Sequence, residues 1–297
     1  MSRICVVGSM NMDLVAISDR RPRPGETIMG REFLTNPGGK GANQAVAAAR
    51  LGADVTMLGC VGNDIYGNSM IRNLTAENVD VQYIKCSEGT STGIAHIVLA
   101  EKDNSIIVVP GANFDVDRSY IDDMISIVKS SDMVLTQLEI PLDTVIYLSE
   151  ICKYHNVPLL LNPAPAILLP QILIDNATYI TPNENEVKVI FKGENNLEEL
   201  LNSYPNKLIV TLGKEGATFS DGEKIFIIPP IDVIVVDTTG AGDTFNGGFA
   251  CGVCSGLGVM RAITFANIAA SLSTTKVGAQ SGIPTLSEVK EKMHLEA

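Results

Sequence analysis

Residues 235–252 read VVDTTGAGDTFNGGFACG, which is an apolar run, a Gly-Ala-Gly turn, an aspartate and then a series of small and apolar residues. We interpret the run before the turn, 231–237, as a strand, and we predict a helix that begins near Gly242. A helix N-terminus carries N–H groups without partners and the positive end of the helix dipole, so such a turn can hold a phosphate or a developing negative charge. Because an aspartate in a first helical turn is also a common cap, Asp243 by itself fits an anion site and an ordinary helix start equally well.

Short apolar runs alternate with amphipathic stretches along the rest of the chain. Nearly continuous apolar runs are typical of strands in a parallel sheet that is covered on both faces. The predicted strands are 4–8, 54–62, 133–138, 158–163, 178–183 and 208–213. The predicted helices are 41–52, 66–79, 142–155 and 196–204. This alternation predicts an α/β fold with a doubly wound, mostly parallel central sheet and helices on both faces.

Two segments break the alternation. Residues 12–36 and 90–109 have strand-like patterns with no helix between the strands. We interpret them as a small β-sheet that forms a lid over a ligand crevice. Because no internal repeat or long linker is present, we expect residues 1–297 to form a single α/β domain into which these lid strands are inserted.

The composition limits the partners and the compartment. The 297 residues carry a net charge of −12, from 34 acidic and 22 basic side chains, which disfavours nucleic acids and anionic membranes as partners. The first apolar run is too short for a signal peptide, and no stretch approaches the length of a membrane span. The six cysteines lie mostly in apolar runs, as reduced thiols do, and form no disulfide framework. We therefore expect a cytoplasmic protein that binds small molecules.

Polar side chains recur at the ends of the predicted strands. Asn11 and Asp13 follow the first strand, and Glu139 follows 133–138. A second glycine-rich helix start adds Lys40 and Asn43. Open α/β sheets bind their ligands at the carboxyl ends of the strands, so this recurrence predicts a ligand site there. Further polar or glycine residues at two later strand ends are Asn183, Glu186, Thr211 and Gly213.

The motifs that carry these residues occur in the order found in the PfkB-type carbohydrate kinase family, which the chain resembles over essentially its full length. The motifs most specific to the family are GGKGAN at 38–43 and DTTGAGDTF at 237–245. NPAPA at 162–166 and KVGAQSGIP at 276–284 are most similar to the members that act on ribose. The resemblance implies ATP-dependent phosphorylation of the ribose 5-hydroxyl to give ribose 5-phosphate.

The resemblance also implies a role for each matching residue. Asp243 would be the catalytic base, and the N–H groups of Gly240, Ala241 and Gly242 would hold the γ-phosphate. The residues that would hold the sugar are Asn11, Met12, Asp13, Gly39, Lys40, Gly41, Ala42, Asn43, Glu139 and Asp243. The residues that would face ATP are Asn183, Glu186, Thr211, Leu212, Gly213, Lys214, Glu215, Gly216, Gly242, Asp243 and Asn267.

Ions and a partner are implied as well. Glu186 would help to organise Mg²⁺ and the phosphates, mainly through water. A monovalent cation, K⁺, would lie beside the turn of Gly240, Ala241 and Gly242, which we call the anion cradle. Its matching residues, several of which would act through backbone carbonyls, are Asp237, Thr239, Ser273, Lys276, Gly278 and Gly282. The family also suggests a homodimer formed through the lid sheets.

The sequence leaves several alternatives to ribose. The closest is 2-deoxyribose. A nucleoside kinase would need a large aromatic surface for the base, whereas this chain has 5% aromatic residues and no tryptophan. A phosphofructokinase-type enzyme would need additional cations, which only the arginines within 20–31 offer. A non-catalytic sugar or nucleotide sensor would not require Asp243 beside an intact cradle.

Overall fold

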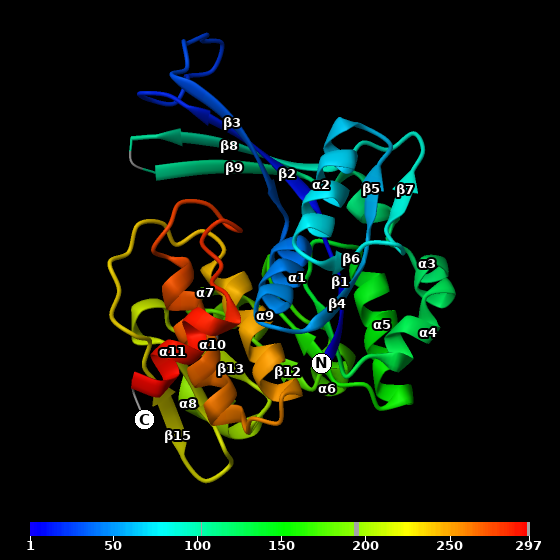
Figure 1. Cartoon of the computed structure of the whole chain (residues 1–297), viewed down its shortest axis with the longest axis vertical. Helices are drawn as coiled ribbons and strands as arrows, with labels where there is room; N and C mark the ends of the chain where they lie inside the picture. The colour runs from blue at the N-terminus through cyan, green and yellow to red at the C-terminus, as the bar shows by residue number, and fades with distance from the viewer. Residues whose placement is uncertain (102, 193–195, 296–297) are drawn as a thin grey trace.

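The structure is a computed structural model that describes residues 1–101, 103–192 and 196–295. A six-stranded parallel sheet with the order β12-β11-β10-β1-β4-β6 runs through its centre (Figure 1). β13 extends this sheet beyond β12 through isolated parallel bridges and then pairs antiparallel with β14, which pairs with β15. The predicted mostly parallel α/β sheet is therefore confirmed. The strands are β1 (Arg3–Val7), β4 (Asp54–Leu58), β6 (Val79–Asp80), β10 (Met133–Thr136), β11 (Leu159–Leu161), β12 (Tyr179–Ile180), β13 (Ile209–Thr211), β14 (Ala217–Ser220) and β15 (Ile225–Ile228).

Helices cover both faces of this sheet because successive side chains of a strand point to opposite sides. In β1, Ile4 and Val6 belong to one hydrophobic core, and Cys5 and Val7 belong to the other. The first core is covered by α1 (Lys40–Arg50), α2 (Ile65–Ala76), α9 (Ala241–Cys254), α10 (Val259–Ser273) and α11 (Leu286–Leu295). The second is covered by α3 (Arg118–Asp123), α4 (Ile125–Ser130), α5 (Leu142–His155), α6 (Gln171–Asn176), α7 (Glu184–Ile190) and α8 (Leu197–Ser203).

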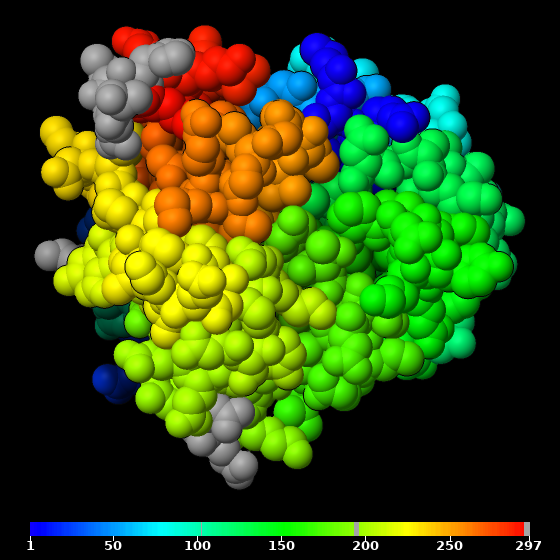
Figure 2. Space-filling model, turned by 90° about the horizontal axis from the view of Figure 1, so that it is seen from below, coloured from blue at the N-terminus to red at the C-terminus, as the bar shows by residue number. Residues whose placement is uncertain are grey.

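A small four-stranded sheet stands off one end of this body (Figure 1). Its order is β3-β2-β8-β9, in which β2 and β8 are parallel and the outer pairs are antiparallel. The strands are β2 (Asn11–Ile17), β3 (Glu32–Gly38), β8 (Gly93–Ala100) and β9 (Asp103–Val109). β2 follows β1 after three residues, so its first residues, Asn11 to Asp13, lie where the small sheet meets the central one. Figure 2 shows the opposite end, where side chains of the segments coloured green to orange form the surface.

The predicted strand at 231–237 is wrong. After β15 the chain passes Pro229 and Pro230 and continues without regular structure to Gly240. The apolar side chains of 231–237 are exposed or half-buried instead of buried, and Ile234 is 87% exposed. Proline cannot donate to a sheet ladder, and the N–H groups of Val236 and Asp237 donate to the Thr274 carbonyl after α10 rather than to a strand. The predicted helix after the turn is present and begins at Ala241.

The predicted strand at 54–62 is divided in two. β4 ends at Leu58, and β5 (Cys60–Gly62) leaves the central sheet to pair with β7 (Lys85–Ser87). The break lies at Gly59, whose N–H donates to the Tyr120 hydroxyl and whose carbonyl accepts from Lys85 N. A β-carbon there would lie 2.8 Å from the Gly8 carbonyl oxygen, so close packing requires glycine at this position.

Within the described residues, no helix is both long and apolar enough to cross a membrane.

Candidate active site

Asp243 lies at a polar cavity of about 150 Å³ at the carboxyl ends of the central strands. Most of the lining residues follow a strand or begin a helix, so the predicted placement of polar groups at this edge is the one observed. Lys40 is the only cationic residue of the lining. The lining consists of Lys40, Asn162, Ala164, Thr181, Asn183, Glu186, Thr211, Gly240, Gly242, Asp243 and Asn246.

The carboxylate of Asp243 is held by two side-chain amides from α1. Its Oδ2 accepts from Asn43 Nδ2 at 2.9 Å, and its Oδ1 accepts from Gln44 Nε2 at 3.0 Å. Asp243 is only 8% exposed, so these contacts replace most of the water that an ionised carboxylate would bind. The partners are far apart in the chain, and the packing of α1 against α9 brings them together.

Sequence reasoning missed Gln44 and the residues behind it. Gln44 Oε1 accepts from Gln137 Nε2 at 2.7 Å, and Gln44 Nε2 also donates to Asn162 Oδ1 at 3.1 Å. Gln137 follows β10 and Asn162 follows β11, so the recurrence of polar residues at strand ends could have identified these two as site residues. Asn246, one turn after Asp243, donates to the Gly242 carbonyl and accepts from Thr181 Oγ1.

Close backbone contact explains the glycines at the start of α1. A β-carbon on Gly39 would lie 2.6 Å from Asn11 N, and one on Gly41 would lie 2.6 Å from Ser9 N. The helix N-terminus therefore packs directly on the loop between β1 and β2. The predicted sugar-site residues Met12 and Ala42 are 2% and 0% exposed and belong to the hydrophobic core, so their side chains pack in the core and are closed to a ligand.

The start of α9 leaves backbone donors available. Gly240 is the N-cap, with φ of 77°, and provides no side-chain cap. Ala241 N donates to the Thr238 carbonyl at 3.2 Å, so this N–H is used inside the turn. The N–H groups of Gly240, Gly242 and Asp243 make no hydrogen bond within the parts of the chain that the structure describes. The unpaired backbone donors at this helix start are therefore these three N–H groups, whereas the predicted donor on Ala241 is already paired within the turn.

Gly240 and Gly242 are glycine for different reasons. Gly240 has left-handed backbone geometry, and a β-carbon there would lie 2.6 Å from the Ala279 carbonyl oxygen. A β-carbon on Gly242 would meet nothing within 4 Å and would project into open space at the cavity. The first glycine is required by the fold, whereas the second keeps the cavity open for a ligand.

This difference predicts opposite outcomes for two alanine substitutions. Gly240→Ala should lower the free energy of unfolding by about 1–2 kcal/mol or more, because left-handed geometry is unfavourable for alanine. Gly242→Ala should leave the melting temperature unchanged or slightly raised but should lower kcat/KM by about 10²-fold, because the methyl group would occupy the space in which the resemblance places the γ-phosphate. Thermal unfolding and steady-state kinetics of both variants check this. Normal kinetics for Gly242→Ala would show that no ligand approaches this residue.

The predicted sugar residues meet at the root of the small sheet. Glu139 Oε2 accepts from Ser9 Oγ at 2.5 Å, from Lys40 N at 3.2 Å and from Asn11 Nδ2 at 3.5 Å. Asn113, which was not among the predicted site residues, donates to Asn11 Oδ1 at 2.7 Å. Asn11 is thus held with its oxygen toward Asn113 and its N–H group toward Glu139.

Charge in this region is unbalanced toward the negative. Burial, together with Glu139 and Asp243, raises the pKa of Asp13 to about 7. Burial by itself would lower the pKa of Lys40, but the carboxylates of Asp243, Glu139 and Glu186 more than offset it, and the pKa is raised. Lys40 therefore stays cationic among carboxylates that converge on it from three other segments.

A second cavity, the Asn267 cavity, has a volume of about 340 Å³ and lies on the other side of the α9 start. Its wall is mainly apolar and includes the exposed run after β15. Asn267 itself donates through Nδ2 to the carbonyls of Ile228 and Pro229, so its amide holds the loop. The lining is Gly213, Lys214, Pro230, Ile231, Asp232, Val233, Val235, Thr238, Ala241, Asn267, Ala270, Ser271 and Thr274.

Some of the other predicted nucleotide residues line one of the two cavities, and the rest line neither. Thr211 lines the Asp243 cavity, and Gly213 and Lys214 line the Asn267 cavity. Leu212, Glu215 and Gly216 line neither. Glu215 is exposed, and Gly216 packs on the Ile228 carbonyl, while Leu212 packs against the second hydrophobic core.

Asn183 and Glu186 form a capping box at the start of α7. Asn183 Oδ1 accepts from the N–H groups of Asn185 and Glu186, and Glu186 Oε2 accepts from Asn183 N. Burial raises the pKa of Glu186, and the Asn183 N–H and Lys40 oppose that shift. Both side chains thus have a structural role as well as a place at the cavity.

The segments predicted to hold a monovalent cation lie together. Asp237 accepts from Thr239 N, from Thr239 Oγ1 and, across 41 residues, from Gly278 N at 2.8 Å. These hydrogen bonds outweigh burial and lower the pKa of Asp237. A β-carbon on Gly282 would lie 2.1 Å from the Ser273 carbonyl oxygen, so these two segments are also in contact. Lys276 is exposed and lies near Glu288.

The chain matches the family model described as pfkB family carbohydrate kinase over residues 1–286. It is similar to the ribokinase of Bacillus subtilis (strain 168), with 52% identity over 294 residues that span 98% of this chain and 99% of the other. It is also similar to the deoxyribokinase of Salmonella typhi, with 35% identity, 98% of this chain and 99% of the other being covered. A solved structure of an Arabidopsis thaliana ribokinase complexed with ribose and ATP has a TM-score of 0.91 and 32% identity, and the match covers 98% of each chain.

Proposed function

Since the chain belongs to the pfkB family of carbohydrate kinases, we propose that it transfers the γ-phosphoryl group of ATP to the 5-hydroxyl of D-ribose, giving ribose 5-phosphate and ADP. The observation that carries the proposal is the start of α9. There a buried carboxylate, Asp243, lies beside backbone N–H donors that face the same cavity. Such a site can accept a proton from a hydroxyl and bind a phosphoryl group at the same place.

Asp243 is the proton acceptor in this proposal. The ribose 5-hydroxyl donates its hydrogen bond to the carboxylate, and its oxygen attacks the γ-phosphorus as the bond to the ADP oxygen breaks. Phosphoryl transfer passes through a loose transition state, so a weak base is sufficient when the hydroxyl is well placed. The amides of Gly242 and Asp243 and the ammonium of Lys40 stabilise the negative charge on the transferred oxygens.

The sugar binds where the small sheet joins the central one. Asn11, Asn43 and Lys40 supply donors, while Asp13 and Glu139 supply acceptors, as a ring of hydroxyls requires. A carboxylate with its partner hydroxyl missing remains buried and unsatisfied, so sugars that lack this hydroxyl are disfavoured. We infer that the small sheet is a lid that excludes water from this site, which would limit the hydrolysis of ATP.

The pKa of about 7 at Asp13 predicts a pH dependence. Below that value the group is neutral, and above it the carboxylate accepts hydrogen bonds from the sugar. For ribose, kcat/KM should therefore rise between about pH 6 and 8, and Asp13→Asn should remove this rise while lowering the value throughout. The same raised pKa makes the stability of the free protein change in the opposite direction. The folded state holds the Asp13 proton more tightly than the unfolded state does, and this contribution to the free energy of unfolding is lost as the pH rises through 7. A profile of kcat/KM with the same slope in both proteins would contradict the assignment.

The ATP phosphates require cations, and the residues present fit them. The Oε1 atom of Glu186 makes no hydrogen bond within the described residues. Mg²⁺ keeps several of its waters and is usually bound by only one or two carboxylates, so this oxygen suits it. Mg²⁺ would neutralise the phosphates during transfer. The Asp237 carboxylate with the backbone carbonyls near Ser273 and Gly282 suits K⁺, which would fix the loop beside the cradle.

We also propose that two copies pair through the small sheets. All of β9 is exposed, and it is an edge strand that carries Ile106, Ile107, Val108 and Val109. A long apolar edge of this kind is normally covered by a partner. Sedimentation velocity should give the mass of a dimer, and a monomer at micromolar concentration would overturn the proposal.

The function is tested by coupled ADP release with ATP and Mg²⁺. D-ribose, 2-deoxyribose, fructose 6-phosphate and adenosine are compared, each with and without K⁺. Turnover with ribose that K⁺ raises is the expected result. A higher kcat/KM for 2-deoxyribose would keep the mechanism and change the substrate, and ribose binding without turnover would indicate a sensor.

A further inference from the structure

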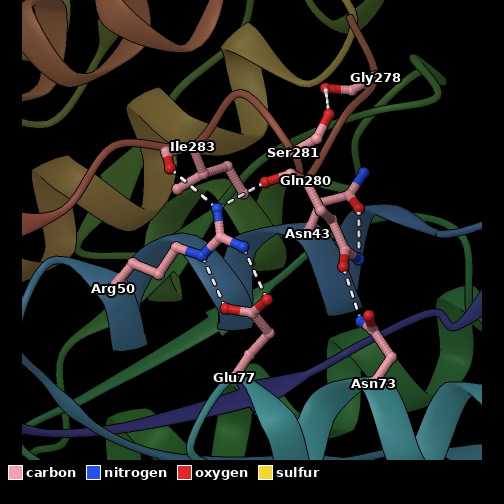
Figure 3. Close-up of polar contacts among 8 residues, drawn as sticks. All are labelled: Asn43, Arg50, Asn73, Glu77, Gly278, Gln280, Ser281 and Ile283. Atoms are coloured by element: carbon pink, nitrogen blue, oxygen red, sulfur yellow. Dashed lines mark hydrogen bonds and ion pairs between the residues drawn. The ribbon is translucent and has the colours of Figure 1, made fainter. Parts of the chain in front are cut away.

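A chain of side-chain amides leads from Asp243 to α2. Asn43 Nδ2 donates to Asp243, Gln280 Nε2 donates to Asn43 Oδ1 at 3.0 Å, and Asn73 Nδ2 donates to Gln280 Oε1 at 2.7 Å. Figure 3 shows Gln280 between Asn43 and Asn73, held by a dashed contact to each. Asn43 and Gln280 are 6% and 8% exposed, so water cannot easily replace either contact.

The direction of every amide in this chain follows from the carboxylate. An ionised carboxylate only accepts, so Asn43 has to present its N–H group to Asp243 and its oxygen to the other side. That oxygen needs a donor, which Gln280 supplies, and the oxygen of Gln280 then accepts from Asn73. If the donor on Gln280 is lost, the buried Asn43 oxygen has no donor among the described contacts, and Asp243 alone is left to orient the amide.

Gln280 is itself fixed by the backbone of its loop. Arg50 Nη1 donates to the carbonyls of Gln280 and Ile283 at 2.7 and 2.9 Å. The guanidinium is held by Glu77 through two hydrogen bonds of 2.7 and 2.6 Å (Figure 3). A bidentate pair of this kind fixes the plane of the Arg50 guanidinium. Because Arg50 lies at the end of α1 and Glu77 follows α2, the loop is anchored to both helices.

The same loop contacts the phosphate side of the site. Gly278 N donates to Asp237, and the neighbouring Ala279 packs on Gly240, the N-cap of α9. Gln280 therefore connects the loop beside the cradle to Asn43. Asn43 in turn donates to Asp243 and is one of the proposed sugar residues.

We propose that Gln280 is a positioning residue for phosphoryl transfer, which holds the Asn43 amide with its N–H group toward Asp243. The proposal rests on the function proposed above, with Asp243 as the base. It assigns Gln280 no contact with the substrate, so its effect has to pass through Asn43.

Four variants test this: Gln280→Leu, Gln280→Glu, Asn43→Ala and the double variant Gln280→Leu/Asn43→Ala. Gln280→Leu should lower kcat/KM for the sugar by about tenfold, within the range measured for coupled neighbours. The double variant should lose no more than Asn43→Ala does, because Gln280 acts through Asn43. Gln280→Glu keeps the size of the side chain, but its carboxylate cannot donate to Asn43. Its activity relative to wild type should be low at pH 8 and should recover as the pH falls, since the protonated acid donates again.

Gln171→Leu is the matched control, since Gln171 is exposed on α6 and donates only to Asp175 in the next turn. It should keep wild-type kinetics. A Gln280→Leu protein within twofold of wild type, or losses that multiply in the double variant, would refute the positioning role even if the melting temperature fell. If ribose is not the substrate, the proposed function fails, and the variants are compared on whichever compound of the panel the wild type phosphorylates. Turnover of none of them would refute both proposals.

Discussion

Asp243→Asn is expected to lower kcat for ribose phosphorylation by about 10²- to 10⁴-fold, the range that general-base catalysis contributes. The KM values for ribose and ATP should change little, because the cradle amides, Lys40 and the other sugar residues are retained. The physical reason is that an amide cannot accept the proton of the 5-hydroxyl. Steady-state kinetics with ADP detection measures the effect.

The substitution has a structural side effect that a second variant removes. Both carboxylate oxygens of Asp243 accept hydrogen bonds, from Asn43 and from Gln44, whereas an asparagine can accept only one of them. In the double variant Asp243→Asn/Asn43→Asp, the introduced amide would donate to the introduced carboxylate on α1, which would still accept from Gln280, so every contact would be restored. This double variant should regain most of the stability and none of the activity. Recovered activity would show that Asp243 holds Asn43 and is not the base.

A matched control is available on α5. Like α9, α5 has 14 residues and an aspartate in its first turn, Asp143, which is exposed. Asp143→Asn removes the same charge from the first turn of a helix of the same length, and it should leave kcat within about twofold of wild type. An equal loss in both variants would mean that helix stability, and not proton transfer, is being measured.

Lys40→Met is expected to have the second largest effect, a fall in kcat/KM for ATP of about 10²- to 10³-fold, as when one electrostatic stabiliser of a transition state is removed. Lys40 is the cation of the Asp243 cavity, and Asp243, Glu139 and Glu186 all raise its pKa. Without it, these carboxylates repel the phosphates. Since Lys40 lowers the pKa of Glu186, its loss should also favour a protonated Glu186, which binds Mg²⁺ poorly.

Lys188→Met on α7 is the comparison, because Lys188 is exposed on the same helix as Glu186 and does not line the cavity. It removes a positive charge from the same region without changing the lining of the cavity, and its kinetics should match wild type. Lys40→Arg should recover part of the activity, because it keeps the charge with a larger group. Unchanged ATP kinetics in Lys40→Met would show that the phosphates do not reach this cavity.

The sequence by itself determined the elements whose signals are local. The helix predicted at 142–155 is observed at Leu142–His155, and the apolar run 4–8 is β1 to within a residue. The strand-then-helix order also determined that polar residues gather at one edge of the sheet, since the carboxyl ends of parallel strands share that edge. The Gly-Ala-Gly turn placed Asp243 at a helix start, which was found one residue earlier than predicted.

Only the tertiary structure decided what depends on contacts between distant segments. The run at 231–237 is as apolar as a buried strand, but no strand among the described residues pairs with it, so it is a largely exposed segment beside a cavity. The partners of Asp243 could not be read from the sequence either, because Asn43, Gln44 and Gln280 are ordinary amides until the packing of α1, α9 and the 278–283 loop brings them together. The physical reason is that periodicity reports the burial pattern of one segment, whereas a hydrogen bond depends on the positions of two.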